Sequence, residues 1–397
     1  MSDGGWDGIP ADVFLDILLR IPLCPRRRLR LVCRHWRDII DERAPEPRAC
    51  AKVLAFSNDG GPHRAYIIDD LTHGGVRRRE LDLLHHSRQD AAEVRLIGTC
   101  NGLLCLLRSH DIAVINPATR ELLAVGLPSA CYYGRNEATY SFGYHPATGR
   151  YKIVHVPHYR AARLDAVRVL TLGDHGPGAA WRDVPAPPGS SCLLRFGLVT
   201  VGAGVTYWVT EDAKRIMSLD LKDDRVAVVE SPPMPVPLVP FNGYGPEYVN
   251  AYPCRLTEVH GKLGLAARRP CDGDMSKTEV WVLEGGKEQE MAWVKRCTVL
   301  AGGAVTRQEI ALPHAMHGEH VLTTYMPGVL SGRQQLTLSA HRPRDERKTR
   351  PCGVVRVDVP KPETVVGVFE SCGVRTFAYV ETGEPLSFYG DKLYRQG

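Results

Sequence analysis

Apolar residues between Ile9 and Asp41 recur with the spacing of two helices. In the first, Val13, Phe14, Ile17, Leu18 and Ile21 occupy positions i, i+1, i+4, i+5 and i+8, which is one face of a helix. Pro10 and Asp12 precede them as helix-start signals. Pro22 and Pro25 then interrupt the pattern, because proline breaks a helix interior. A second helix is predicted from the apolar side made by Leu29, Val32, Cys33, Trp36, Ile39 and Ile40.

The first predicted helix carries more apolar surface than its neighbours in the sequence can cover. Leu15 and Leu19 add a second apolar face, and a helix that is apolar on most of its circumference has to be buried on most of it. A unit of roughly 35 residues without disulfides or metal is too small to supply that core alone. We therefore expect another protein to cover part of this surface. The alternative is that the helices pack against the rest of their own chain.

Downstream of Asp41 the helical periodicity stops, and short β-rich runs separated by turn residues take its place. The segment ERAPEPRA, with two prolines among charges, predicts a linker or loop. The predicted strands lie within VLAFSNDGG, AYIIDD, VRLIGTCNGLLCLL, IAVINPATRELLAV, YSFGYHPATGRYKIVHV, VRVLTL, GVTYWV, IMSLDLKDDRVAVVE, KLGLAAR, EVWVLE and MAWVKRCTV. Strands this short and this evenly punctuated predict an all-β sandwich, barrel or propeller.

A weak internal repeat favours the propeller among these three. Similar units begin at Asn101 and Ala203, and a looser one begins at His260. Meander units at irregular spacing fit the blades of a propeller or a propeller-like array better than a single sandwich. The repeats are too degenerate to fix the number of blades. The predicted organisation is a small all-α domain over residues 5–45, followed by a large all-β, propeller-like domain of short antiparallel meanders over residues 46–397.

Composition limits the classes of partner. The 397 residues are 44% hydrophobic and 24% charged, and the net charge is only +5. That charge is too small for a charge-driven nucleic-acid or membrane-surface binder of this length. No stretch approaches the roughly 20 apolar residues that cross a bilayer, so we expect no membrane protein. Twelve scattered cysteines predict free thiols in a reducing compartment, the cytoplasm or the nucleus.

Two sets of motifs resemble a known pairing of domains. The segment GIPADVFLDILLRIPLCPRRRLRLVCRHWRDII resembles an F-box over residues 9–41. The motifs LIGTCNGLLCLL, VINPATRELLAV, FGYHPATGRYKIV and EVWVLE resemble, over about residues 95–300, the β-rich F-box-associated domain of plant F-box proteins. The resemblance implies a substrate receptor of a cullin-based ubiquitin ligase of the SCF type. In that arrangement the F-box docks on a Skp-type adaptor and the β domain holds the target protein for ubiquitination.

The resemblance also implies which residues bind the adaptor. The matching hydrophobic positions are Ile9, Pro10, Val13, Ile17, Leu18, Ile21, Pro22, Val32, Cys33 and Trp36. Two departures stand out: isoleucine replaces the usual leucine of each Leu-Pro pair, and Pro25-Arg26-Arg27 replaces an apolar Ser-Leu-Leu. The second departure removes apolar contacts and is expected to weaken or alter docking. Burying a single large apolar side chain contributes roughly 1.5–3 kcal/mol, so a few anchors such as Leu18, Ile21 and Trp36 suffice.

Motifs that imitate metal sites are better explained as structure. Cys100 and Cys105 flank Asn101-Gly102, a type I′ hairpin signal, and their spacing does not match a zinc knuckle; we expect buried thiols in strands. The segment from Cys271 imitates a calcium loop, but Lys277 and Leu283 occupy its glycine and glutamate positions. A solvated hairpin loop is the better explanation, and no metal or cofactor is expected.

The segment HAMHGEH leaves two hypotheses open. His314, His317 and His320 recur every three residues, and imidazoles so spaced can share a metal if the segment bends or is helical. Gly318 disfavours a helix, and an exposed loop is the favoured interpretation. The basic clusters at 77–79 and 341–350 are likewise expected to be solvated loops.

No catalytic motif is present, and the chain is not expected to be an enzyme. The sequence lacks G-x-S-x-G, a Walker loop, a dinucleotide fingerprint and HExxH. Asp69-Asp70 and Asp223-Asp224 are expected in turns, where aspartate is common for backbone reasons. The alternative function is a β-propeller module that binds protein or glycan with no link to ubiquitination. A third hypothesis, a propeller hydrolase, requires clustered carboxylates or a metal in the central pocket.

Overall fold

The computed structural model describes the greater part of the chain. It covers residues 11–20, 29, 32–43, 51–57, 64–69, 71, 77–81, 83, 94–128, 137–157, 166–174, 180–193, 197–202, 204–210, 212, 214–229, 254–270, 275–286, 289–302, 307–326, 335–343, 353–357, 364–369, 373–390 and 393–395. No helix among these residues is long and apolar enough to cross a membrane.

The β residues form six sheets, which we number as blades 1 to 6 in chain order. Blade 1 contains β1 (Lys52–Ser57), β2 (Arg64–Ile68), β3 (Arg78–Leu81), β21 (Leu312–Pro313) and β27 (Val374–Tyr379). Blade 2 contains β4 (Arg95–Cys100), β5 (Leu103–Leu107), β6 (Asp111–Asn116), β7 (Glu121–Gly126) and β28 (Leu393–Arg395). Blade 3 contains β8 (Tyr140–His145), β9 (Arg150–His155), β10 (Ala166–Thr171) and β11 (Arg182–Pro185).

The remaining three blades follow the same antiparallel plan. Blade 4 contains β12 (Val199–Val201), β13 (Val205–Val209), β14 (Ile216–Asp220) and β15 (Arg225–Val228). Blade 5 contains β16 (Cys254–Val259), β17 (Lys262–Pro270), β18 (Met275–Gly286), β19 (Gln289–Gly302) and β25 (Gly353–Val357), the last parallel to β19. Blade 6 contains β20 (Arg307–Ile310), β22 (Met316–His317), β23 (His320–Met326), β24 (Leu336–His341) and β26 (Thr364–Phe369). Two short 3₁₀ turns, η3 (Glu137–Thr139) and η6 (Leu386–Phe388), complete the described elements of this domain.

Strand composition follows position within a blade. The central strands pack on both faces, so their sequences are nearly continuous apolar runs: all five residues of β5, LLCLL, are buried. The outer strands have one free edge and face solvent, so β3 reads RREL and β15 reads RVAV, both mainly exposed. Burial on two faces explains the apolar runs that the sequence showed.

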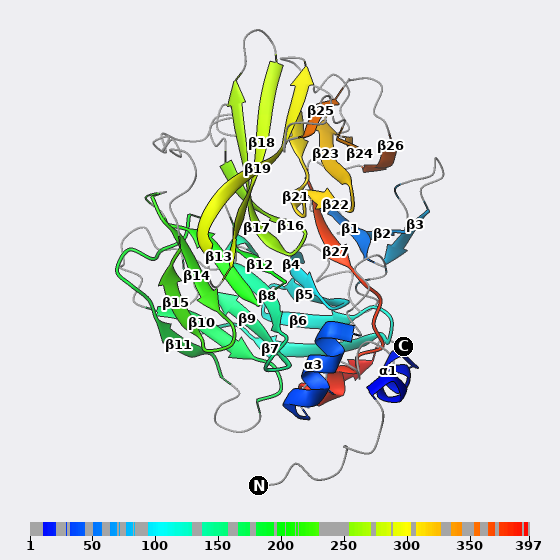
Figure 1. The fold of residues 1–397 in the computed structure, drawn as a ribbon, viewed down its shortest axis with the longest axis vertical. Coiled ribbons are helices and arrows are strands. Elements are labelled where there is room, and N and C mark those ends of the chain that lie inside the picture. Colours follow the sequence, from blue (N-terminus) through cyan, green and yellow to red (C-terminus); the bar gives the residue numbers. More distant parts are fainter. Residues whose placement is uncertain are drawn as a thin grey trace.

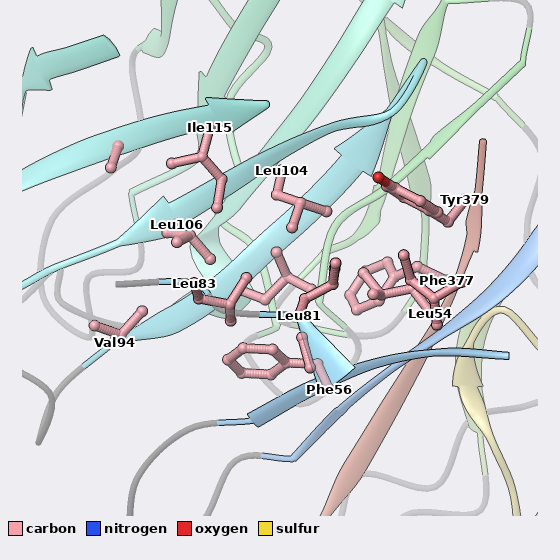
Figure 2. Close-up of a cluster of buried hydrophobic side chains, with 14 of the residues drawn as sticks. Leu54, Phe56, Leu81, Leu83, Val94, Leu104, Leu106, Ile115, Phe377 and Tyr379 are labelled. Atoms are coloured by element: carbon pink, nitrogen blue, oxygen red, sulfur yellow. The ribbon is translucent and has the colours of Figure 1, made fainter. Parts of the chain in front are cut away.

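One apolar cluster lies at each junction between neighbouring blades. The cluster between blades 1 and 2 joins Leu54 and Phe56 of β1 to Leu104 and Leu106 of β5, with Phe377 of β27 beside them (Figure 2). Five further clusters lie between blades 2 and 3, 3 and 4, 4 and 5, 5 and 6, and 6 and 1. Six junctions for six blades make a closed ring. The predicted propeller is therefore confirmed, and the structure adds the blade number.

The two ends of the β domain close the ring together. Strand β27 pairs with β1 along six residue pairs, from Lys52 with Tyr379 to Ser57 with Val374, and Figure 1 shows β27 in red beside β1 in blue. The chain then crosses to blade 2, where β28 pairs with β7. The segment between them is held by Asn116, whose side-chain amide donates to the Thr382 and Glu384 carbonyls at 3.0 and 2.8 Å.

The N-terminal helices form a unit with its own core. Helix α1 spans Ala11–Arg20 and α3 spans Arg34–Arg43. Their apolar cluster contains Phe14, Leu18, Ile39 and Ile40, with Leu29 and Trp36 packed against it, and it includes no described residue of a strand. The predicted all-α unit ahead of a large all-β domain is therefore observed in the described residues.

Candidate functional site

Helix α1 has two apolar stripes, one buried against α3 and one exposed. Phe14 and Leu18 are 6% and 0% exposed and face α3, where the Phe14 and Trp36 rings meet edge to face at 4.7 Å. Val13 and Ile17, four residues apart and so on one side of the helix, are 52% and 46% exposed. We call Val13 and Ile17 the α1 stripe. It is apolar surface that the chain itself leaves uncovered.

The ten predicted adaptor-binding residues divide into three groups. Val13, Ile17 and Val32 are exposed, the last at 57% in the turn before α3. Cys33 and Trp36 are half-buried, and Leu18 is completely buried inside the helix pair. Ile9, Pro10, Ile21 and Pro22 lie outside the described residues. Leu18 therefore stabilises the helix pair, and substituting it tests folding before it tests binding.

A cavity of about 630 Å³ lies at the hub of the propeller. The innermost strands surround it: β4, β8, β12, β16, β22 and β27 all contribute lining residues. Most of the described wall is apolar and comes from residues such as Ile97, Phe142, Val199, Met316 and Phe377. The tight turns after β4 and β16 also line the cavity.

The first of these turns has the predicted geometry. Asn101 and Gly102 have φ values of 52° and 83°, both positive as a type I′ turn requires. His260 and Gly261 repeat the pattern at 50° and 79°, although the sequence did not suggest a turn of this type there. A Cβ on Gly102 would collide with the Val380 carbonyl oxygen, so glycine is required where the C-terminal segment passes over the turn.

The inner edge of blade 6 is broken, and the break brings His314 to the hub. Strands β20 and β22 both pair with β23, while β21 between them pairs in parallel with β27 of blade 1. The His314 N–H donates to the Thr376 carbonyl at 3.1 Å, and the Thr376 hydroxyl donates to the His314 carbonyl at 2.8 Å. On the other side, the Thr257 hydroxyl donates to the Pro313 carbonyl at 2.8 Å. Residues 313–314 therefore join three blades.

A chain of hydrogen bonds runs through this junction. The Glu258 Oε2 atom lies 2.6 Å from His314 Nδ1, and His314 Nε2 lies 3.1 Å from His317 Nδ1. We call Glu258, His314 and His317 the hub triad. The Gly261 N–H donates to the other carboxylate oxygen, Glu258 Oε1.

The surroundings set the charge of the hub triad. Burial opposes ionisation of Glu258, but the hydrogen bond and charge of His314, with the Gly261 N–H, outweigh it and lower the Glu258 pKa. Burial, and then the neighbouring His314, lowers the pKa of His317 to about 4. Glu258 is therefore an anion and His317 is neutral at physiological pH.

The structure corrects the expectation for the motif HAMHGEH. HAMHGEH is not an exposed loop, because His314 is 6% exposed at the hub and His317 begins a two-residue hairpin that faces His320 across β22 and β23. Among the described residues no group of three or more His, Cys, Asp or Glu side chains could hold a metal ion. The partner that sequence reasoning missed is Glu258, 56 residues earlier in the chain.

The basic run at 77–79 is solvated, as expected, but Arg78 and Arg79 lie in a strand and not in a loop. Arg78 and Arg79 belong to β3; the Arg78 guanidinium lies 4.4 Å from the Tyr66 ring centre, and Arg79 pairs with Glu381. Of the run at 341–350, residues 344–350 lie outside the described residues.

Two of the other predicted small motifs can be compared with the structure, the cysteine pair and Asp223-Asp224. Cys100 and Cys105 are free thiols in β4 and β5, half-buried and buried respectively. Asp223 and Asp224 lie in the turn between β14 and β15, and Asp224 bridges blades 3 and 4 by accepting from Lys152 at 2.5 Å. Asp70 and the start of the imitation calcium loop, residues 271–274, lie outside the described residues.

Known proteins share both halves of this architecture. A family profile described as "F-box associated beta propeller domain" matches residues 77–325, and one described as "F-box domain" matches residues 6–45. F-box protein At3g07870 of Arabidopsis thaliana is 23% identical over 328 residues, which cover 75% of this chain and 73% of that protein. F-box/LRR-repeat protein At2g43260 of the same plant is 26% identical over 239 residues, 55% of this chain and 54% of that protein.

Solved structures give a more distant likeness. A chain of the nidogen/laminin complex aligns with a TM-score of 0.39 and 12% identity over 83% of this chain and 99% of its own length. Helices ahead of six blades define a propeller protein with an N-terminal helical module. Because the propeller profile spans more than half of its length, the chain belongs to the F-box-associated β-propeller family.

Proposed function

We propose that this chain is the non-catalytic substrate receptor of a cullin-based, SCF-type ubiquitin ligase. In this proposal the F-box docks on a Skp-type adaptor, and through it on a cullin, while the propeller binds the target protein. The family match to an F-box at residues 6–45 supports the first half. The observation that carries it is the α1 stripe, two apolar side chains about half exposed on a helix that already has a buried face.

The α1 stripe has the size that adaptor docking needs. Val13 and Ile17 are about half exposed, so covering each contributes about half of the roughly 1.5–3 kcal/mol for full burial. Every 1.4 kcal/mol is a factor of about ten in affinity. Replacing both with aspartate removes that contribution and adds the cost of desolvating two charges. The two positions are exposed in the free chain, so the change is expected to leave its folding intact.

The test is binding of the full chain to a purified Skp-type adaptor. The double substitution Val13→Asp, Ile17→Asp is expected to weaken binding by at least about 100-fold with an unchanged melting temperature. Val228→Asp is the matched control, because Val228 is also an aliphatic residue, 47% exposed, but lies on β15 of the propeller. An adaptor affinity that survives the double substitution would overturn the docking proposal.

The propeller is proposed to hold the target, which the chain alone does not name. Proximity labelling in cells with and without proteasome inhibition tests this half, since a degraded target should accumulate near the receptor only when the proteasome is blocked. We propose the cytoplasm, the nucleus or both as its location. Targets that are labelled but equally abundant under both conditions would favour a propeller binding module without a role in ubiquitination.

A hydrolase finds no support at the hub. The described wall of the cavity holds a single carboxylate, Glu258, and that carboxylate is engaged by His314 and Gly261. The clustered carboxylates that hydrolysis by a propeller would require are not found among the described lining residues.

A further inference from the structure

Glu258 is the single carboxylate in the described wall of the cavity at the hub of the propeller, which we call the hub cavity, and that wall contains no Lys or Arg. The Glu258 side chain is 20% exposed, so the cavity gives access to it. Among the described residues its carboxylate bonds to His314 and to the Gly261 N–H, and it pairs with no lysine or arginine. The buried Glu279 of β18, in contrast, pairs with two lysines at 2.8 and 3.2 Å. Glu258 therefore lacks the counter-charge that Glu279 has.

The bonds of the hub triad do not require a positive charge on either ring. An ionised carboxylate can only accept, so the proton between Glu258 and His314 resides on His314 Nδ1. His314 Nε2 can then accept from the Nδ1–H of His317 at 3.1 Å. Two bonds use two protons, which is the number that two neutral imidazoles carry. His260 likewise needs only one ring proton to donate from Nε2 to the Gly318 carbonyl at 2.8 Å. These bonds therefore leave the negative charge of Glu258 unbalanced.

An unbalanced anion in a mainly apolar wall favours a cationic ligand. Glu258 uses two of its roughly four acceptor sites, for His314 and Gly261, so a ligand can donate to the others. A hydrogen bond from an ammonium to a carboxylate is about twice as strong as one between neutral groups, and apolar surroundings strengthen it further. An anionic ligand would meet the like charge of Glu258. Because one carboxylate balances one positive charge, a monocation fits best.

Size and enclosure indicate a small molecule. A volume of about 630 Å³ lies within the range of roughly 300–1,000 Å³ that is typical of small-molecule sites. Inner strands of all six blades surround the cavity, which favours a small molecule over the broad surface of a folded protein. We propose that the hub cavity binds a small organic monocation with an apolar body, whose ammonium N–H donates to the Glu258 carboxylate. This site is additional to adaptor docking and does not depend on it.

Four probes with one apolar body test the chemistry by calorimetric titration of the unmodified full chain. They are 2-naphthylmethylammonium, its N,N,N-trimethyl analogue, 2-naphthylmethanol and 2-naphthoate. The primary ammonium is expected to bind at least about tenfold more tightly than the alcohol, and the carboxylate most weakly. The trimethyl analogue keeps the charge but has no N–H, so its affinity should lie between those of the ammonium and the alcohol. An alcohol, carboxylate or trimethyl probe that binds as tightly as the primary ammonium, or no binding of the ammonium, would overturn the proposal.

A substitution of the carboxylate tests the origin of this preference. Glu258→Gln keeps a side-chain oxygen that can accept from His314 and Gly261 but removes the charge. It is expected to abolish the preference for the ammonium, while the affinity for the alcohol changes by less than about threefold. Glu80→Gln is the control, because it removes an exposed carboxylate on the outer strand β3 and should keep the full preference. A preference that persists in Glu258→Gln would contradict the role of Glu258.

A second pair of substitutions localises the binding and leaves the hub triad intact. Ala378 lines the cavity on β27 and is exposed, so Ala378→Trp is expected to fill the space and to lower the affinity for the ammonium at least about tenfold. Ala227, equally small and exposed but on the outer strand β15, provides the control Ala227→Trp, with unchanged affinity. Equal affinity in both variants would place the binding elsewhere and contradict the site. Adaptor binding, measured in parallel, should remain unchanged in both.

Discussion

In the centres of the blades, strands such as β5 carry apolar residues on both faces and bury them all, whereas α1 buries one apolar stripe and exposes the other. Helix α1 and the turn before α3 supply three of the eight large apolar residues that are exposed in the described chain, Val13, Ile17 and Val32, although the N-terminal unit is a small fraction of the length. Relative to its length, the N-terminal unit therefore exposes more large apolar residues than the propeller does.

The difference follows from how each region is closed. The propeller is a ring, so every blade face has a neighbour and six junction clusters bury most of its large apolar side chains. Two helices can bury only the faces that they turn toward each other. Apolar residues that such a pair leaves exposed mark a binding surface. For this reason we propose that the adaptor binds to the helices and not to the outer strands.

The most direct test of this difference shortens one side chain in each stripe of α1 and compares the stability of the two variants. Leu18→Ala removes a fully buried side chain and is expected to destabilise the helix pair by about 2–5 kcal/mol. Ile17→Ala, one position earlier but 46% exposed, should change stability by less than about 0.5 kcal/mol. The rate of limited proteolysis within α1 of the full chain measures the stability of the helix pair in both variants. Equal cleavage rates in the two variants would show that the stripes do not differ.

A second test addresses the closure of the ring. Asn116→Ala removes the two hydrogen bonds to the segment between β27 and β28, and is expected to cost roughly 1–3 kcal/mol for each bond. Asn116→Asp keeps the side-chain oxygen that accepts from the Ala118 N–H but loses the donor, so it should also lower the melting temperature of the propeller. A melting temperature unchanged in both variants would remove this anchor from the closure.

A third and smaller effect is acid sensitivity that originates inside the propeller. Burial, and then Arg168, lowers the pKa of His155 to about 3, while the unfolded chain titrates near 6.5. Between these values the unfolded state holds a proton that the folded state lacks, so stability falls as the pH decreases from about 6.5 toward 3. One such group contributes a slope of up to about 1.4 kcal/mol per pH unit.

Denaturant unfolding at several pH values measures this slope. His155→Phe keeps a ring stacked on Tyr140, whose centre lies 4.4 Å away, and should flatten the pH dependence. His110→Asn, at an exposed position, should leave the slope as it is. A slope that survives in His155→Phe would assign the acid sensitivity to other groups, of which His317 is the next candidate because its pKa is also lowered.

Local pattern was sufficient to predict most of the β domain. Every run predicted as a strand overlaps one, from VLAFS in β1 to MAWVKRCTV in β19. The repeats beginning at Asn101, Ala203 and His260 correspond to the three strands that follow the innermost strand in blades 2, 4 and 5. Their inner strands β4, β12 and β16 precede each repeat. The repeat is therefore the three-stranded meander of a blade without its innermost strand.

Pairing between distant residues is what the sequence could not reveal. No strand was predicted after Val299, yet β20 to β28 follow. Several of these are two or three residues long, and β27 and β28 pair with strands from the other end of the chain. For the same reason the sequence suggested only two residues of the hub triad. His314 and His317 are close in sequence, whereas Glu258 contacts His314 only through the broken inner edge of blade 6.

Hydrogen–deuterium exchange of the full chain, alone and with a purified Skp-type adaptor, tests most directly whether the α1 stripe is the covered surface. We expect exchange across residues 11–20 to slow by at least about tenfold in the complex, while the peptide that contains β15 of the propeller is unchanged. A stable complex in which α1 exchanges as fast as in the free chain would contradict this assignment.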